Sequence, residues 1–120
     1  MDLSFELRPG YLRAVARRRE TVEETRDAHR RLVEEMERLR IGRVMACLYE
    51  SRAIFKVESY NLSAVFDRLA AIPGFRLALV SDSAESFGSH QYIQLLALQR
   101  GLQVRAFREE PAAEAWLLDG

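Results

Sequence analysis

The chain has 120 residues and balances 18 basic against 18 acidic side chains, which argues against a nucleic-acid-binding protein, whose surface is usually basic. Its 48% hydrophobic and 30% charged residues are typical of a globular protein, and we expect one domain over residues 1–120. The chain has a lone cysteine, and its N-terminus lacks a signal-peptide pattern. No apolar run approaches the ~18 residues of a membrane span. These features predict a cytoplasmic protein that does not cross a membrane.

The first 17 residues predict a β-hairpin. Apolar and polar side chains alternate over residues 3–8, which is the period of a half-buried strand. Pro9-Gly10 is a turn dipeptide, and residues 11–17 form the second predicted strand.

A long amphipathic helix is predicted next. Thr21 and Glu24 have the spacing of a capping box, in which each side chain bonds the other residue's backbone N–H. Apolar residues then recur at intervals of three and four up to Leu39. We expect Ile41-Gly42 to end the helix, with Gly42 in the left-handed conformation.

The rest of the chain alternates strands with helices. Residues 43–49 form a nearly continuous apolar run, which favours a parallel strand covered on both faces, and strands are also predicted at 75–80 and 102–107. Helices are predicted at about 61–72, 89–100 and 111–117. Residues 81–90 are expected to be a polar loop, whereas 50–58 fit either an ordered loop or a short extended segment.

This order, ββαβαβαβα, predicts an α/β fold. Strands separated by helices run parallel through right-handed crossovers, and the opening hairpin adds one antiparallel strand. The expected product is a mixed five-stranded sheet flanked by about four helices.

No catalytic, cofactor-binding or metal-binding motif is found. His29 and His90 are far apart, lack a second ligand at zinc spacing, and are expected at or near the surface. Cys47 lies inside an apolar strand, as a buried structural cysteine does. Neither a glycine-rich phosphate loop nor a nucleophile elbow is present. The sequence therefore predicts a protein that is not an enzyme and has no cofactor.

Two polar stretches follow strand-like segments and are candidate sites. Ser81, Asp82 and Ser83 lie just past a predicted parallel strand, where ligands collect in open α/β sheets, so they could hold a small anion or simply cap the next helix. In the stretch 58–61, Ser59 or Asn61 is suited to cap the helix that follows, and a helix N-terminus also tolerates a phosphate.

Several strings in the chain resemble the SpoIIAA-like group of the STAS superfamily. They are RVMACLY, FRLALVSD, QRGLQVRAF and the ending EEPAAEAWL, on top of the hairpin and the capped first helix. The resemblance implies a mixed sheet flanked by helices. It also implies a role like that of anti-sigma factor antagonists, which bind a kinase and are switched by phosphorylation of a serine in an Asp-Ser-Ser-Gly-Leu turn. The fold implied is also similar to lipid-binding Sec14-type domains.

The family's switch is only partly present in this chain. The turn falls on Glu58–Leu62, with Glu58, Ser59 and Leu62 as counterparts of the acid, the first serine and the leucine. The phosphorylated serine falls on Tyr60 and the glycine on Asn61, the residue type that tolerates a left-handed backbone best after glycine. Ser59 takes the serine's place only if the register slips by one residue.

The leading hypothesis is a non-enzymatic domain that presents residues 50–62 to a protein partner. Arg52, Phe55 and Tyr60 are its candidate contacts, because arginine and aromatic residues are enriched at binding surfaces. The alternative is a small-molecule or lipid-binding domain with a pocket between the sheet and helices 61–72 and 89–100, which a pocket above ~300 Å³ would favour. A homodimer through the hairpin edge or an apolar helix face is left open.

Overall fold

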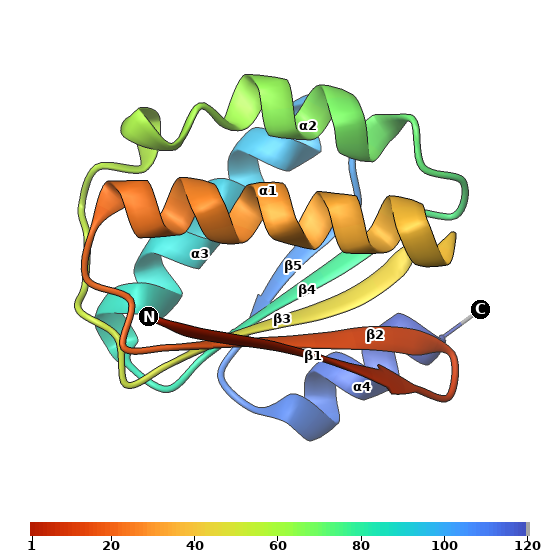
Figure 1. Ribbon diagram of the computed structural model, residues 1–120, viewed down its shortest axis with the longest axis horizontal. Helices are drawn as coiled ribbons and strands as arrows, with labels where there is room; N and C mark the ends of the chain where they lie inside the picture. Colours follow the sequence, from red (N-terminus) through yellow and green to blue (C-terminus); the bar gives the residue numbers. More distant parts are fainter. Residues whose placement is uncertain (120) are drawn as a thin grey trace.

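The computed structural model describes residues 1–119 and contains a five-stranded sheet in the order β1-β2-β3-β4-β5 (Figure 1). Strand β1 is antiparallel to β2, and every other neighbouring pair is parallel. The predicted α/β fold with a mixed sheet is therefore confirmed. The strands are β1 (Asp2–Arg8), β2 (Tyr11–Arg17), β3 (Arg43–Tyr49), β4 (Arg76–Ser81) and β5 (Val104–Phe107); the helices are α1 (Val22–Leu39), the 3-10 helix η1 (Val57–Tyr60), α2 (Leu62–Ala70), α3 (Ala84–Gln99) and α4 (Glu110–Leu118).

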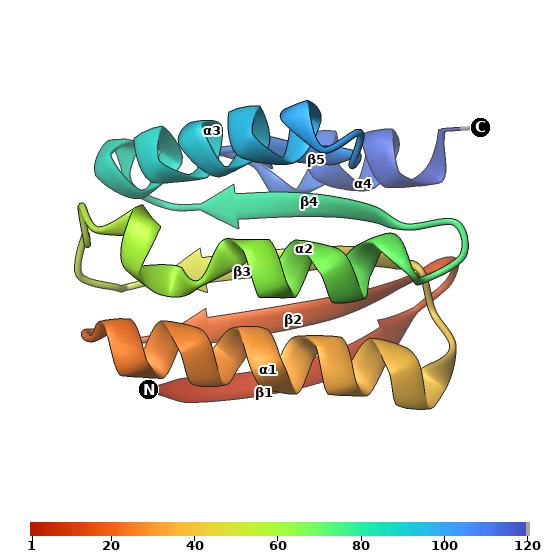
Figure 2. The same cartoon turned by 90° about the horizontal axis from the view of Figure 1, so that it is seen from above.

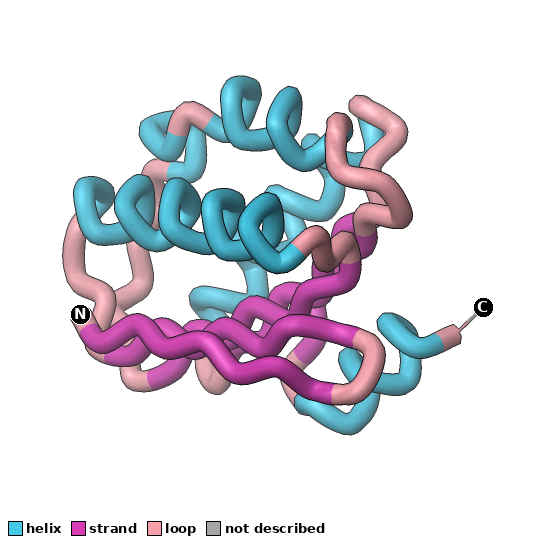
Figure 3. The backbone as a smooth tube through the Cα atoms, turned by 45° about the vertical axis from the view of Figure 1, so that its right-hand side comes forward, coloured by secondary structure: helices cyan, strands magenta, loops and turns pink. Residues whose placement is uncertain are grey.

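Three helices cover one face of the sheet and one covers the other. Because β2 to β5 follow one another across the sheet, crossovers of a single hand place α1, α2 and α3 on the same face. Figures 1 and 2 show these helices side by side over the strands, with α4 on the opposite face. The tube view shows the same two layers around the strands (Figure 3). Within residues 1–119, no helix has both the length and the apolar character needed to cross a membrane.

The two faces of the sheet carry separate cores because alternate strand residues point to opposite sides. On β3, Val44 belongs to the core beneath α1–α3, whereas Met45 and Cys47 belong to the core against α4. This arrangement explains the continuous apolar run of residues 43–49. It also confirms that the strand is covered on both faces and that Cys47 is buried.

Helix α1 begins as predicted and ends differently. The Thr21–Glu24 capping box is present, with the Glu24 N–H donating to the Thr21 hydroxyl at 3.0 Å. The left-handed residue at the other end is Arg40, with φ 56°, and not Gly42. A Cβ at Gly42 would lie 2.3 Å from the carbonyl oxygen of Pro73, so this position requires glycine for lack of space rather than for a left-handed turn.

The prediction of a polar loop over residues 81–90 is wrong for most of its length. Helix α3 begins at Ala84, five residues before the expected Ser89. The Ser83 hydroxyl accepts a hydrogen bond from the Ser86 N–H at 3.1 Å and caps the helix. Serines scattered through this stretch hide the helical periodicity, although a serine is also what an N-cap requires.

Helix α4 is attached to the sheet by polar contacts as well as by its apolar face. Arg13 donates two hydrogen bonds of 2.8 Å to the two carboxylate oxygens of Glu110, and Tyr11 donates one of 2.6 Å to Glu114. This bidentate pair holds the pKa of Glu110 at about 2, chiefly through the hydrogen bonds from Arg13. Trp116 on α4 is half-buried and packs on Phe107, with ring centroids 5.9 Å apart.

Candidate ligand-binding cavity

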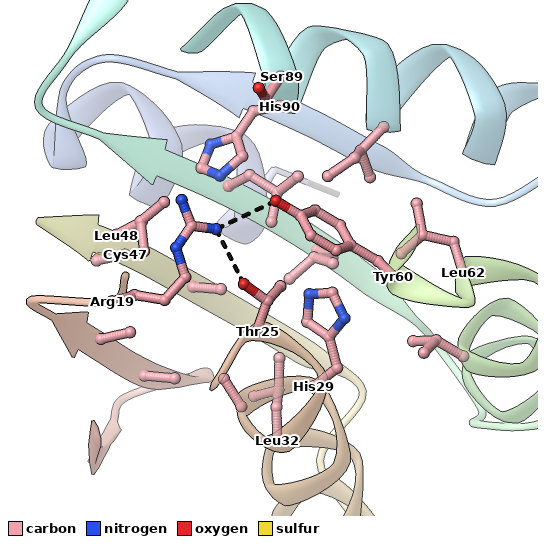
Figure 4. Close-up of a pocket in the computed structure, with 18 of the residues that line it drawn as sticks. Arg19, Thr25, His29, Leu32, Cys47, Leu48, Tyr60, Leu62, Ser89 and His90 are labelled. Carbon is pink, nitrogen blue, oxygen red and sulfur yellow. Dashed lines mark hydrogen bonds between the residues drawn. The ribbon is translucent and has the colours of Figure 1, made fainter. Parts of the chain in front are cut away.

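A cavity of about 120 Å³ lies between the sheet and the helical layer of α1, α2 and α3 (Figure 4). It is at the place where the sequence predicts a pocket, with α1 as an additional wall, but it is smaller than the ~300 Å³ expected of a pocket for a drug-sized ligand. Most of its lining is apolar and includes Ala14, Ala16, Ala46, Leu48, Val65, Phe66 and Ile93. Its polar lining residues are Arg19, Thr25, His29, Tyr60, Ser86, Ser89 and His90.

Arg19 is the charged residue of this cavity, and only 6% of its surface is exposed. Its guanidinium donates to the Thr25 hydroxyl at 3.1 Å and to the Tyr60 hydroxyl at 3.4 Å, and also to the Arg52 carbonyl at 2.7 Å. A guanidinium has five N–H donors, so at least two are unused, and the buried Nε is one of them. Among residues 1–119, no carboxylate lies within 4.0 Å of this cation.

A local change in the backbone brings Arg19 into the cavity. Side chains of β2 alternate, and Ala14 and Ala16 line the cavity. Continued alternation would place Arg18 on this side. Arg18 instead adopts a left-handed conformation, with φ 57°, and remains exposed, so that Arg19 takes the inward position. In the sequence Arg19 is the last of three consecutive arginines, and nothing there distinguishes it from a surface residue.

Both histidines border the cavity; His29 keeps the boundary position that was expected, whereas His90 is buried, contrary to the expectation. His90 on α3 is 8% exposed, and His29 on α1 is half-buried with its Nδ1 inside. Neither Nδ1 has a hydrogen-bond partner among the described residues. Burial, reinforced by the charge of Arg19, lowers the pKa of His29 to about 4 and that of His90 to about 3. At neutral pH both rings are uncharged, and Arg19 remains the cavity's cation.

Tyr60 is buried and not available as a partner contact, so this part of the interaction hypothesis is wrong. It is 4% exposed, its hydroxyl faces Arg19, and its ring lies edge-on to His29 with centroids 5.8 Å apart (Figure 4). Helix η1 directs it inward, and the following Asn61 has φ 57° and ψ 46°. Asn61 thus has the left-handed backbone that this residue type tolerates best after glycine. Neither Asn61 nor Ser59 caps α2 through its side chain.

The other residues of the 50–61 stretch lie nearer the surface. Phe55 is 74% exposed, Arg52 and Glu58 are exposed, and Ser59 is half-buried with its carbonyl accepting from the Arg26 Nε at 2.8 Å. Residues 50–56 form the ordered loop that was one of the two predicted alternatives. Of the three predicted partner contacts, Tyr60 thus faces the interior, whereas Arg52 and Phe55 lie at the surface.

The three residues of the candidate anion loop, Ser81, Asp82 and Ser83, have separate places in the fold. Ser81 belongs to β4 and is fully buried, with its hydroxyl unpartnered among the described residues. The Asp82 carboxylate accepts from the Glu50 N–H at 3.0 Å, and Ser83 caps α3. Asp82 and Ser83 therefore already bond to the backbone of neighbouring segments. The negative charge of Asp82 would also repel an anion.

The chain's single cysteine, Cys47, borders the cavity. Burial raises the pKa of the Cys47 thiol to about 11, so the thiolate needed for nucleophilic attack is scarce at neutral pH. In residues 1–119, no group of three or more His, Cys, Asp or Glu side chains is placed to hold a metal ion. What the residues provide is an apolar space with one cation, two neutral imidazoles and several hydroxyls around it.

Comparisons with protein-family models, with curated proteins and with solved structures find no match for this chain. Assignment to a family therefore remains a proposal based on sequence patterning.

Proposed function

We propose that this protein is a non-enzymatic regulatory domain that binds a small molecule in the cavity beneath α1, α2 and α3. The observation that carries the proposal is the buried guanidinium of Arg19, which borders an apolar cavity without a carboxylate partner. Burying an unpaired charge is costly, and proteins usually pair such a group or use it. A bound ligand supplies the missing partner.

The size of the cavity supports a small ligand. An engineered cavity of about 150 Å³ holds benzene, so 120 Å³ suits a ligand with an apolar body of about five or six heavy atoms. Left empty, a cavity of this volume costs about 3 kcal/mol of stability at ~24 cal/mol per Å³. A ligand that fills the cavity offsets this cost and thereby stabilises the fold.

Xenon is a suitable probe of the cavity because it enters dry apolar spaces of this size. We expect xenon pressure to shift the methyl NMR signals of Leu48, Val65 and Ile93, which line the cavity. Ala46→Ile should fill the space and remove these shifts. Ala112→Ile, at an exposed position on α4, is the matched control and should keep them. Unshifted cavity methyls in the wild-type protein would reject the proposal.

The family resemblance supports a regulatory and cytoplasmic role of this kind. STAS-like and Sec14-type domains are regulatory or ligand-binding modules, and we propose that this chain is a STAS-like domain. A serine switch of the anti-sigma factor antagonist type receives less support, because the position of the switch serine holds the inward-facing Tyr60.

A second candidate function is binding of a protein partner, and the exposure of Phe55 favours it. A shallow groove between the 50–58 loop and α3 is lined by Phe55, Val57, Gly88 and Tyr92. Exposed Leu95 and Leu98 continue this apolar surface along α3. Sedimentation of the wild type and of Phe55→Ser tests the simplest partner, a second copy. We expect self-association that the substitution weakens, and a wild type that stays monomeric at high concentration excludes the homodimer.

A further inference from the structure

The cavity and the groove outside it share a wall. A surface groove of about 430 Å³ lies between α1 and α2, and His29, Val33, Tyr60 and Val65 line both this groove and the cavity. Movement of the Tyr60 and His29 rings would connect the two spaces. Figure 4 shows these rings next to each other, on the side of the cavity nearest α2.

From this geometry we infer that the ligand is a small monocarboxylate with a branched or cyclic apolar body, whose carboxylate pairs with Arg19. The inference rests on the proposed function and adds the chemical class of the ligand. An arginine fork matches the two oxygens of a carboxylate, and such charge-assisted bonds are stronger than neutral ones.

The charge balance selects a monoanion. Arginine stays positively charged in proteins, whereas both cavity histidines are neutral at pH 7. One negative charge on the ligand therefore leaves the cavity neutral. A phosphate dianion would leave a net buried negative charge, and a neutral ligand would leave Arg19 uncompensated; both are costly in an apolar environment.

The groove provides a second observation that favours an anion. It is lined by Arg26, Arg30 and Arg68 but by a single acid, Glu58. Arg30 and Arg68 have carboxylate partners on α1, whereas Arg26 donates to the Ser59 carbonyl and has no carboxylate within 4.0 Å among residues 1–119. Arg26 therefore presents one cation at the mouth that lacks a carboxylate partner among residues 1–119 and can attract an anion.

The test compares two isosteric probes, 3-methylbutanoate and its neutral carboxamide, 3-methylbutanamide. Affinities are measured from the shifts of the cavity methyls in the wild-type protein. We expect the carboxylate to bind at least tenfold more tightly than the amide, and more tightly than the dianion methylphosphonate at pH 8.5. Equal affinities for acid and amide would overturn the inference.

Substitutions of Arg19 assign the preference to its charge. Arg19→Met should abolish the preference for the carboxylate, whereas Arg19→Lys, which keeps the charge without the planar fork, should reduce it. Arg18→Met, which removes an exposed neighbouring charge, should leave it unchanged. A preference that persists in Arg19→Met overturns the inference. If Arg19→Met does not fold, the inference is tested by the affinities of the acid and the amide for the wild type and for Arg19→Lys.

Xenon separates the two levels of failure. Xenon binding without a carboxylate preference leaves the proposed cavity function standing and overturns the ligand class. Absence of xenon binding overturns the proposed cavity function and, because the ligand class rests on it, the ligand class as well.

Discussion

Arg19 and Arg52 hold each other through two reciprocal hydrogen bonds. The Arg52 N–H donates to the Arg19 carbonyl at 3.0 Å, and the Arg19 guanidinium donates to the Arg52 carbonyl at 2.7 Å. The Arg19 N–H also donates to the Ser51 hydroxyl at 3.1 Å. The side chain that borders the cavity therefore also holds the loop that carries the exposed Phe55. A ligand that draws the guanidinium toward itself would act on this loop.

The first prediction concerns this link between cavity and loop. Arg19→Met removes the bond to the Arg52 carbonyl, and we expect amide hydrogen exchange to become at least tenfold faster within residues 51–56. Mass-spectrometric exchange of the peptide that covers the loop measures this. Arg18→Met is the matched control, because Arg18 is exposed and its side chain pairs with Asp2 on β1. Equal exchange in the two variants would show that Arg19 does not hold the loop.

The second prediction is a loss of stability in mild acid caused by the buried histidines. The pKa of His90 is about 3 in the folded state against about 6.5 when unfolded, so below pH 6.5 the unfolded chain binds the additional proton. The stability contributed by the neutral ring is thus full above pH 6.5 and decreases as pH falls toward 3, by about 1.4 kcal/mol per pH unit. The neutral ring of His29 also contributes stability above pH 6.5, and this contribution decreases as pH falls toward its pKa of about 4.

Urea unfolding of wild type and His90→Gln at pH 7.5 and 5.0 measures this effect. We expect the wild type to lose about 2 kcal/mol more than the variant between the two pH values. The charged and titratable groups that act on the His90 ring are Arg19 and His29. Because the pKa of His29 is also lowered, His29→Gln should likewise remove part of the wild type's loss of stability between pH 7.5 and 5.0. The same loss in wild type and His90→Gln would contradict neutral burial of His90.

The third prediction concerns the attachment of α4. Glu110→Gln removes the negative charge that receives two hydrogen bonds from Arg13, and we expect a loss of about 2 kcal/mol at pH 7. Because the pKa of Glu110 is about 2 in the folded state and about 4.5 when unfolded, this contribution is complete above pH 4.5 and is lost as pH falls toward 2. Chemical denaturation at pH 7 and 3 tests both statements.

Glu109→Gln serves as the control for this charge. Glu109 is exposed, and its side chain does not cap α4, so its substitution should change stability by no more than about 0.5 kcal/mol. Similar losses in the two variants would mean that net charge, rather than the Arg13 pair, is responsible.

The fourth prediction uses two glycines with opposite surroundings. Gly42→Ala forces a methyl group to 2.3 Å from the Pro73 carbonyl oxygen, and we expect it to lower the free energy of unfolding by about 1 to 3 kcal/mol. Gly88 lies inside α3, and beyond its chain neighbours and the helix's own backbone no atom is within 4 Å of the added carbon, so Gly88→Ala should raise stability by up to about 1 kcal/mol. Thermal unfolding of both variants distinguishes these signs. If Gly42→Ala leaves stability unchanged, the backbone at Pro73 and Gly74 must shift to make room for the methyl group at little cost.

The fifth prediction separates the two aromatic residues of the 50–61 stretch. Tyr60→Ala should cost about 3 kcal/mol or more, because it removes a buried ring and the hydroxyl that accepts from Arg19. Phe55→Ala should change stability by no more than about 0.5 kcal/mol because its side chain is exposed. Urea denaturation compares them directly. Equal losses of stability in the two variants would contradict the burial of Tyr60 and the exposure of Phe55.

Local patterns in the sequence were sufficient for the architecture. The capping box of α1, the alternation in β1 and the continuous apolar run of β3 each depend on residues a few positions apart, so they can be recognised without the fold. Element ends were less predictable. Helix α1 ends at a left-handed Arg40, and α3 begins within a serine-rich stretch, because neighbouring elements stabilise conformations that local preference alone does not select.

The site depended on contacts between residues far apart in the chain. Periodicity and the handedness of crossovers are properties of the covalent chain, and they determined the mixed sheet and its helices. Only the tertiary structure turned Arg19, His90 and Tyr60 toward one cavity. Their inward positions result from the left-handed Arg18, from the early start of α3 and from the 3-10 helix before Asn61. Burial then lowers the histidine pKa values and leaves one charge unpaired, and burial is a property of the packed molecule.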